Sequence, residues 1–157
     1  MRNWFSTINK KLESIEDILL PSLFILTLIL SVLQIILRNI FNFGLPWADP
    51  LLRSMVLWLG MFGALYATRM NRHISIDIIN NYLTPSIKHF IHKLIYLFSA
   101  IVCFICSYFS VPFLLMEYED GTMAFSNIPA WLTESIIPIA LLIMGIRFMS
   151  FSFARKI

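Results

Sequence analysis

Four long apolar blocks divide the chain, at residues 21–41, 48–68, 93–116 and 129–151. Each is close to the roughly 20 residues that an α-helix needs to cross the hydrocarbon core of a bilayer. No block shows the alternation of apolar and polar residues that is typical of a barrel strand. The pattern therefore predicts an all-α integral membrane protein in which residues 1–157 form a single membrane domain.

Two further segments are amphipathic rather than apolar throughout. Over residues 2–19, apolar side chains recur at helical spacing from Trp4 to Leu19, with polar side chains opposite. Pro21 is expected to end this helix and to start the first span. Residues 74–83 repeat the pattern more weakly. Both segments are predicted to be helices that lie in the membrane interface on the cytoplasmic side.

The distribution of charge predicts the orientation in the membrane. Nine of the 12 basic residues fall on the termini and the middle loop, and the other two loops carry none. Basic loops stay in the cytoplasm, so the termini and the middle loop are expected there. The acidic loop with Glu117, Glu119 and Asp120 is then expected to face outward and is a possible docking loop. The net charge of +3 is a topology signal, and no nucleic-acid partner is expected.

Two ionisable residues lie at matching depths within the spans. Arg53 and Glu134 are each about a turn and a half from the outer end of their apolar block. An unpaired charge in hydrocarbon is costly, so these two residues are predicted to pair across the bundle. The pair would either fix the register of two helices or leave one member to contact a partner protein or an anionic lipid. Direct contact with a substrate is a third alternative.

Other polar and aromatic residues suit the membrane boundaries. Arg38, near the outer end of the first span, could reach Asp49 or a lipid phosphate, although snorkelling to the headgroups is the expected role. Arg147 is expected to be a snorkelling anchor near the inner end of the fourth span. Trp47 suits the outer aromatic belt. Membrane lipids are therefore expected partners of these side chains.

A face of small residues lies on the second span, at Gly60, Gly63 and Ala64. Small residues let another helix approach closely, so this face could pack inside the chain or against another subunit. The four spans lack the dense polar groups and broken helices that are typical of a substrate path. This pattern argues against a carrier that acts alone.

The segment RNIFNFGLPWADPLLRSMVLWLGMFGALYATRMNRHISIDI, residues 38–78, resembles the signature of a known family. It is similar to the small membrane subunit, called DctQ-like, of tripartite ATP-independent periplasmic (TRAP) transporters. The positions that carry the resemblance are Arg38, Trp47, Asp49, Arg53, Trp58, Gly63, Ala64, Arg69, His73, Ile74 and Asp77. The chain departs from the family at Pro50, where members usually have a second acid, so charge partners are not transferred by analogy.

The resemblance implies a function in the bacterial inner membrane. The small subunit would scaffold a large multi-spanning subunit and help to dock a periplasmic substrate-binding protein. Uptake of an organic acid, of the C4-dicarboxylate or sialic acid class, would be driven by sodium ions. His73 and Asp77 would belong to the interfacial helix. Neither enzymatic activity nor a cofactor is expected.

Two other functions compete with this interpretation. A membrane anchor of a respiratory enzyme would bind haem or quinone and would need histidines that project inward from different helices. The three histidines here, His73, His89 and His92, cluster at the cytoplasmic rim, and two of them share a helix. A small multidrug exporter would need an acid in the middle of its span, whereas Glu134 lies near the outer end.

Overall fold

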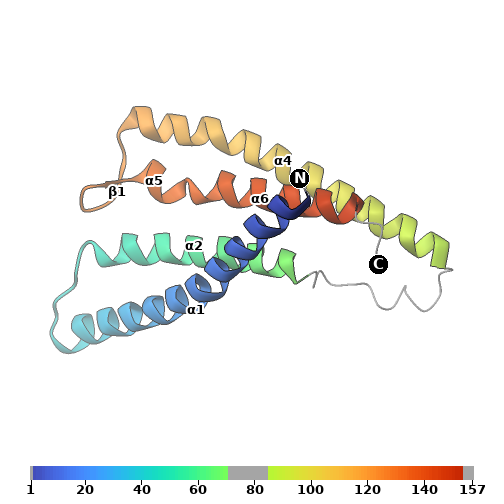
Figure 1. Ribbon diagram of the computed structural model, residues 1–157. Coiled ribbons are helices and arrows are strands. Elements are labelled where there is room, and N and C mark those ends of the chain that lie inside the picture. The colour runs from blue at the N-terminus through green and yellow to red at the C-terminus, as the bar shows by residue number, and fades with distance from the viewer. Residues whose placement is uncertain (1, 71–84, 154–157) are drawn as a thin grey trace.

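The computed structural model describes residues 2–70 and 85–153, with side chains given for 16–70 and 91–153. Its elements are five α-helices and one short β-hairpin (Figure 1). In chain order they are α1 (Arg2–Ile40), α2 (Ala48–Arg69), α4 (Pro85–Asp120), β1 (Met123–Phe125), β2 (Ile128–Pro129), α5 (Ala130–Glu134) and α6 (Ile136–Phe153).

The predicted fold class, an all-α membrane protein, is confirmed. Four stretches are long and apolar enough to cross a membrane: Glu16–Ile40, Ala48–Arg69, Ile91–Asp120 and Ala130–Phe153. The fourth comprises α5 and α6, which are separated only by Ser135. The short helix predicted at residues 74–83, with His73 and Asp77, lies outside the described residues.

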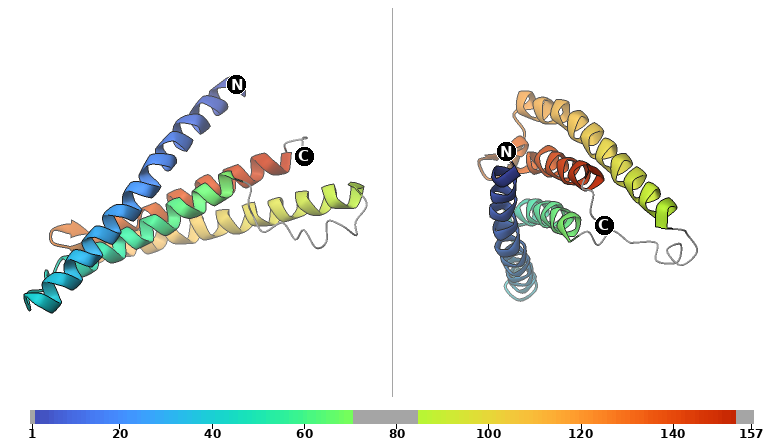
Figure 2. Two further views of the ribbon diagram at one scale, coloured as in Figure 1. Left: turned by 90° about the horizontal axis from the view of Figure 1, so that it is seen from below. Right: turned by 45° about the vertical axis from the view of Figure 1, so that its right-hand side comes forward.

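The helices are arranged in the spatial order α1, α2, α6, α4. Helix α4 packs along α6, and α2 packs between α1 and the fourth span. The connections at residues 41–47 and 121–129 lie together at one end of the bundle, which we call the loop end (Figures 1 and 2). The opposite end, where α1 begins and α6 ends, is called the terminal end. The two helices joined by each of these connections run in opposite directions, as successive membrane crossings require.

Helix α1 differs from the sequence prediction at Pro21. The helix was expected to end there, but it continues from Arg2 to Ile40 with Pro21 inside it. Proline removes one backbone hydrogen bond, whereas a full break within hydrocarbon would leave several backbone groups without partners. The continuous helix is therefore less costly. Residues 2–19 extend from the first span, and Figure 2 shows this part of α1 leading away from the other helices.

The core lies where α2, α4 and α6 meet. Its buried apolar side chains are Leu65, Tyr96, Ala100, Ala140, Met144 and Phe148. Gly145 is part of this contact, because a Cβ atom built on it would lie 3.0 Å from the Phe104 ring. The missing side chain thus lets α4 and α6 approach closely.

A small hairpin at the loop end was not predicted. Strands β1 and β2 pair antiparallel after Gly121, whose positive φ of 62° suits the residue that ends a helix. The Ala130 backbone N–H donates to the Thr122 carbonyl at 2.9 Å. This bond holds the hairpin close to the start of α5.

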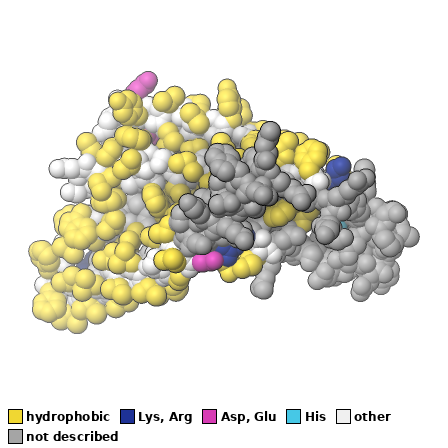
Figure 3. Space-filling model, viewed as in Figure 1, with side chains coloured by type: hydrophobic (Ala, Val, Ile, Leu, Met, Phe, Trp, Pro, Cys, Tyr) yellow, Lys and Arg dark blue, Asp and Glu magenta, His cyan; other side chains and the backbone are white. Residues whose placement is uncertain are grey.

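The surface of the bundle is largely apolar. Figure 3 shows hydrophobic side chains spread over the described part of this face. On α4 alone, Phe98, Tyr108 and Phe109 are each about two-thirds exposed or more, at 68%, 72% and 68%. Such a surface needs lipid or another membrane protein around it.

Candidate functional site

A buried ion pair joins the first and fourth spans at the terminal end. Arg147 of α6 places Nη2 2.6 Å from Oε1 of Glu16 on α1. Both side chains are almost fully buried, at 6% and 4% exposed. Arg147 Nη1 also donates to the Leu65 carbonyl of α2 at 2.8 Å. One arginine therefore links three helices.

A second arginine extends this arrangement. Arg69, at the end of α2, forms an ion pair with Asp17 and lies 3.9 Å from Oε2 of Glu16. Its guanidinium also stands over the Tyr66 ring, 4.8 Å from the centroid. We call Glu16, Asp17, Arg69 and Arg147 the terminal cluster. Its two acids and two bases balance in charge.

The terminal cluster corrects the role predicted for Arg147. It was expected to snorkel to the headgroups, but its guanidinium turns inward to Glu16. An unpaired charge at such a place costs from about 3 kcal/mol upward, and a pair with further hydrogen bonds avoids much of that. The signal in the sequence was the position of Glu16 and Asp17, just before the first apolar block and at the depth of both arginines.

Polar contacts at the loop end join helices without an ion pair among the described residues. Gln34 of α1, which is buried, donates from Nε2 to Oδ1 of Asp49 on α2 at 2.6 Å. Arg38 was named as a residue that could reach Asp49, but the hydrogen bond to Asp49 comes from Gln34. Arg38 is exposed and lines a pocket with Ser31, Gln34 and Asp49.

Two more hydrogen bonds connect the helices near the loop end. Trp58, a residue of the family signature, donates from Nε1 to the Thr133 carbonyl of α5 at 2.7 Å. Ser107 of α4 donates to the Pro138 carbonyl of α6 at 2.9 Å. Both acceptors belong to the fourth span, so α2 and α4 are fixed to it from two sides.

The predicted pair of Arg53 and Glu134 is not formed. Neither residue has an ion pair within the part of the chain that carries described side chains. Arg53 is exposed on α2 and lines a pocket with Asp49, Leu52 and Val56. The two charges match in depth, but they belong to different faces of the bundle.

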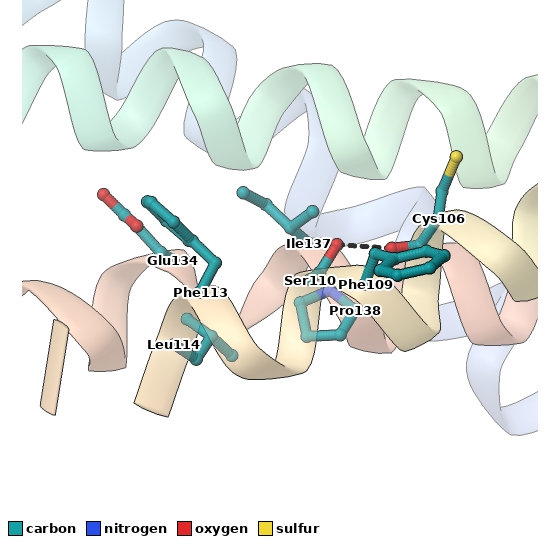
Figure 4. Close-up of a pocket in the computed structure, with 8 residues that line it drawn as sticks. All are labelled: Cys106, Phe109, Ser110, Phe113, Leu114, Glu134, Ile137 and Pro138. Atoms are coloured by element: carbon teal, nitrogen blue, oxygen red, sulfur yellow. Dashed lines mark hydrogen bonds between the residues drawn. The ribbon is translucent and has the colours of Figure 1, made fainter. Parts of the chain in front are cut away.

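Glu134 lies in a groove of about 370 Å³ between α4 and the fourth span. Its Oε2 atom is buried and has no hydrogen-bond partner in the structure. Figure 4 shows its carboxylate beside the Phe113 ring of α4. We call this the Glu134 groove, defined by its lining residues Cys106, Phe109, Ser110, Phe113, Leu114, Glu134, Ile137 and Pro138.

The small-residue face of α2 is divided between two uses. Ala64 packs against the core cluster. Gly60 is exposed, and a Cβ atom on Gly60 or Gly63 would meet nothing within 4 Å. The structure thus leaves Gly60 and Gly63 open on the outside of the described bundle.

The remaining candidates lie at the loop end. Trp47 is 43% exposed, as an anchor in the interface would be. Glu119 and Asp120 end α4 and are exposed, whereas Glu117 accepts a hydrogen bond from the Thr122 hydroxyl. Tyr118 stands edge-on to Trp131, with ring centroids 5.8 Å apart.

The described side chains form neither a metal centre nor a catalytic constellation. No group of three His, Cys, Asp or Glu that could hold a metal occurs among them. Their polar groups instead hold helices together, as in the terminal cluster, or remain open, as at Arg53 and Glu134. This arrangement is suited to packing and to contact with partners.

These features define a multi-pass membrane protein with an internally paired end and an open end. A family model described as the DctQ component of tripartite ATP-independent periplasmic transporters matches residues 27–156. The match covers most of the chain, from within α1 to beyond α6. The chain therefore belongs to this family, and the resemblance seen in its sequence is confirmed. It is a transport component rather than an enzyme.

Three relatives illustrate the similarity. The chain is 24% identical over 139 residues to the sialic acid TRAP transporter permease protein SiaT of Haemophilus influenzae (strain 86-028NP), covering 86% of this chain. It is 29% identical over 146 residues, or 93% of this chain, to a TRAP transporter small permease protein of Haemophilus influenzae (strain ATCC 51907 / DSM 11121 / KW20 / Rd). It is 31% identical over 115 residues, or 71% of this chain, to the C4-dicarboxylate TRAP transporter small permease protein DctQ of Rhodobacter capsulatus.

The relatives differ in length from this chain. The matched part is 22% of SiaT, 85% of the second protein and 51% of the Rhodobacter protein. The family is therefore established for the chain, whereas a substrate does not follow from these names.

Proposed function

We propose that this chain is the small membrane subunit of a TRAP-type secondary transporter. It would assemble with a large multi-spanning membrane subunit and a periplasmic substrate-binding protein. Uptake would be driven by sodium ions, and the substrate would be an organic acid of the C4-dicarboxylate or sialic acid class. The observation that carries the proposal is the family match over residues 27–156, and the names of two relatives support the substrate classes.

The contacts within the bundle favour a scaffold over a carrier. Arg147, Glu16 and Arg69 are engaged with one another at the terminal end. Gln34 donates its amide N–H, and Trp58 its indole N–H, in hydrogen bonds between helices. A substrate path needs polar groups that are free to bind and release a solute, so the moving part of the transporter is assigned to the large subunit.

The proposed orientation places the loop end in the periplasm of a bacterial inner membrane and both termini in the cytoplasm. It is supported by the connections at residues 41–47 and 121–129, which carry no Lys or Arg. A periplasmic binding protein would then meet the exposed carboxylates of Glu119 and Asp120.

Co-purification tests the proposal directly. The chain is tagged at its carboxyl end, extracted from native membranes in mild detergent, and the proteins bound to it are identified by mass spectrometry. A stoichiometric, very hydrophobic multi-span partner is expected. Isolation of the chain alone, or with a soluble redox enzyme and a Soret band, would contradict the proposal, and the latter result would favour the respiratory anchor.

Docking is tested by charge reversal at the loop end. The Glu119→Lys/Asp120→Lys variant is expected to lower uptake most at limiting concentrations of binding protein, because electrostatic contacts chiefly set the association rate. Lys93→Glu, at the terminal end, serves as the control. Equal uptake by the double variant and wild type at every concentration of binding protein would exclude this docking surface.

A further inference from the structure

We infer that the Glu134 groove receives a basic side chain from a transmembrane helix of the large subunit. This inference rests on the proposed function and specifies one face of the small subunit that meets the large subunit. Three features of the described residues carry it: an acid without a partner, the absence of a suitable base nearby, and exposed apolar walls.

The acid has no partner among the side chains that the structure describes. Glu134 lies one turn inside the span Ala130–Phe153, and its Oε2 atom is buried without a hydrogen bond. The one hydroxyl in the described lining of the groove, on Ser110 of α4, is already committed, because it donates to the Cys106 carbonyl at 2.6 Å. The Glu134 carboxylate is therefore the one charged group in the described lining of the groove, and it is uncommitted.

Every basic side chain that the structure describes is placed elsewhere. Arg69 and Arg147 belong to the terminal cluster, and Lys93 is exposed near the same end. Arg38 and Arg53 lie at the loop end, but they line pockets beside Asp49 that share no residue with the Glu134 groove. A counter-charge for Glu134 must therefore come from outside the described chain.

The walls of the groove favour a helix as the source of that charge. Phe109 and Phe113 of α4 are 68% and 48% exposed, so the apolar wall opens to the outside of the bundle. The groove extends along α4 from Leu114 to Cys106, two helical turns from the loop end toward the middle of the span (Figure 4). A helix of the large subunit packed against this wall would cover its apolar side chains and bring a basic side chain to the depth of Glu134. A lipid amine would instead remain with the headgroups at the membrane surface.

Site-directed cross-linking tests where the partner lies. The full complex is expressed with a photoreactive benzoylphenylalanine in place of Phe113 in the groove, or in place of Phe24 on α1 as the matched control. Phe24 is 49% exposed, nearly the same as Phe113. Cross-linking to the large subunit is expected from position 113 and not from position 24. Cross-links from position 113 only to lipid, or only to a second copy of this chain, would overturn the inference.

Neutralisation tests the charge itself. Glu134→Gln is expected to reduce the large subunit recovered with the tagged chain about tenfold or more, which is the scale of losing one partner of a desolvated charge pair. Lys93→Gln removes an exposed charge at the terminal end, outside the groove, and is expected to leave the recovery of the large subunit unchanged. Wild-type recovery by Glu134→Gln would overturn the inference even if cross-linking succeeds.

A charge swap completes the test. The residue cross-linked to position 113 identifies a helix of the large subunit, and its nearest Lys or Arg is changed to Glu together with Glu134→Lys. Recovery of the complex in the double variant, but in neither single variant, is expected. If the large subunit fails to co-purify even with the wild-type chain, the proposed function itself is wrong. If the large subunit co-purifies with the wild-type chain and its recovery is unchanged by substitution of Glu134, only the assignment of the groove is wrong.

Discussion

Among the described residues, charged side chains are paired at one end of the bundle and unpaired at the other. At the terminal end, Glu16 and Arg147 are both buried and face one another. At the loop end, Arg53 and Glu134 each lie without an ion pair among the described side chains, and helices are joined there by neutral donors such as Trp58. Both ends lie within or next to membrane spans, so the cost of an unpaired charge is similar at both.

The difference separates two functions of charge in a membrane protein. Paired charges at the terminal end fix α1, α2 and α6 relative to one another, and their removal should act on the isolated chain. Open charges at the loop end contribute little to the chain itself, so their removal should act on assembly. Variants at the two ends can therefore confirm or contradict this division of roles.

The largest effect on the isolated chain is expected for Arg147→Leu. This variant leaves the Glu16 carboxylate buried without its closest partner, since Arg69 is 3.9 Å away and already paired with Asp17. Breaking a buried pair in this way costs about 3–5 kcal/mol. The free energy of unfolding would be compared in detergent by circular dichroism during heating.

The matched control is Arg53→Leu, an equal change at an exposed position. The double variant Glu16→Leu/Arg147→Leu is expected to recover most of the loss, because two apolar side chains replace the pair. Unfolding of Arg147→Leu at the wild-type temperature would show that the terminal cluster does not stabilise the bundle.

The four spans could be predicted from the sequence because bilayer thickness fixes the length of an apolar helix. The continuity of α1 through Pro21 could not be predicted. Proline is common at the first position of a helix, but it is also tolerated inside a membrane-spanning helix. The hairpin after Gly121 was also missed, because two very short strands leave almost no pattern.

The candidate site was less predictable, because it depends on how the helices rotate and on which helices are neighbours. Depth along the span suggested Arg53 and Glu134 as a pair, yet the two residues face different pockets. Arg147 was assigned to the headgroups because Glu16 lies 131 residues away in the chain, and a matching depth alone does not show that two helices are neighbours. For Asp49 the sequence offered Arg38 as one residue within reach, whereas in the structure Gln34, one turn earlier on α1, makes the contact.

A smaller effect is expected for Gly145→Leu, which tests packing between α4 and α6 independently of charge. Its side chain would meet the Phe104 ring, where even a Cβ atom lies at 3.0 Å. Overpacking of this kind costs about 1–3 kcal/mol. Gly60→Leu is the control, because open space surrounds Gly60. Equal thermal stability of the two variants would contradict the close approach of the helices at Gly145.

Trp58→Phe is expected to have a still smaller effect. It removes the indole N–H that donates to the Thr133 carbonyl at 2.7 Å and leaves an aromatic ring in place. The net loss is about 1 kcal/mol, typical of one hydrogen bond. Trp47→Phe makes the same change at a side chain that is 43% exposed. If both variants lower the unfolding temperature equally, the loss comes from ring size and not from the bond.

The smallest effect on the isolated chain is expected for Arg53→Gln. The arginine is exposed and has no ion pair among the described side chains, so its loss should leave the unfolding temperature unchanged. Recovery of the large subunit with the tagged chain should nevertheless fall, because an open charge within a span needs a counter-charge from a partner. Lys93→Gln, an exposed base at the terminal end, is the control for net charge. A destabilised chain with normal recovery of the partner would reverse the roles assigned to the two ends, since Arg53 would then act within the bundle.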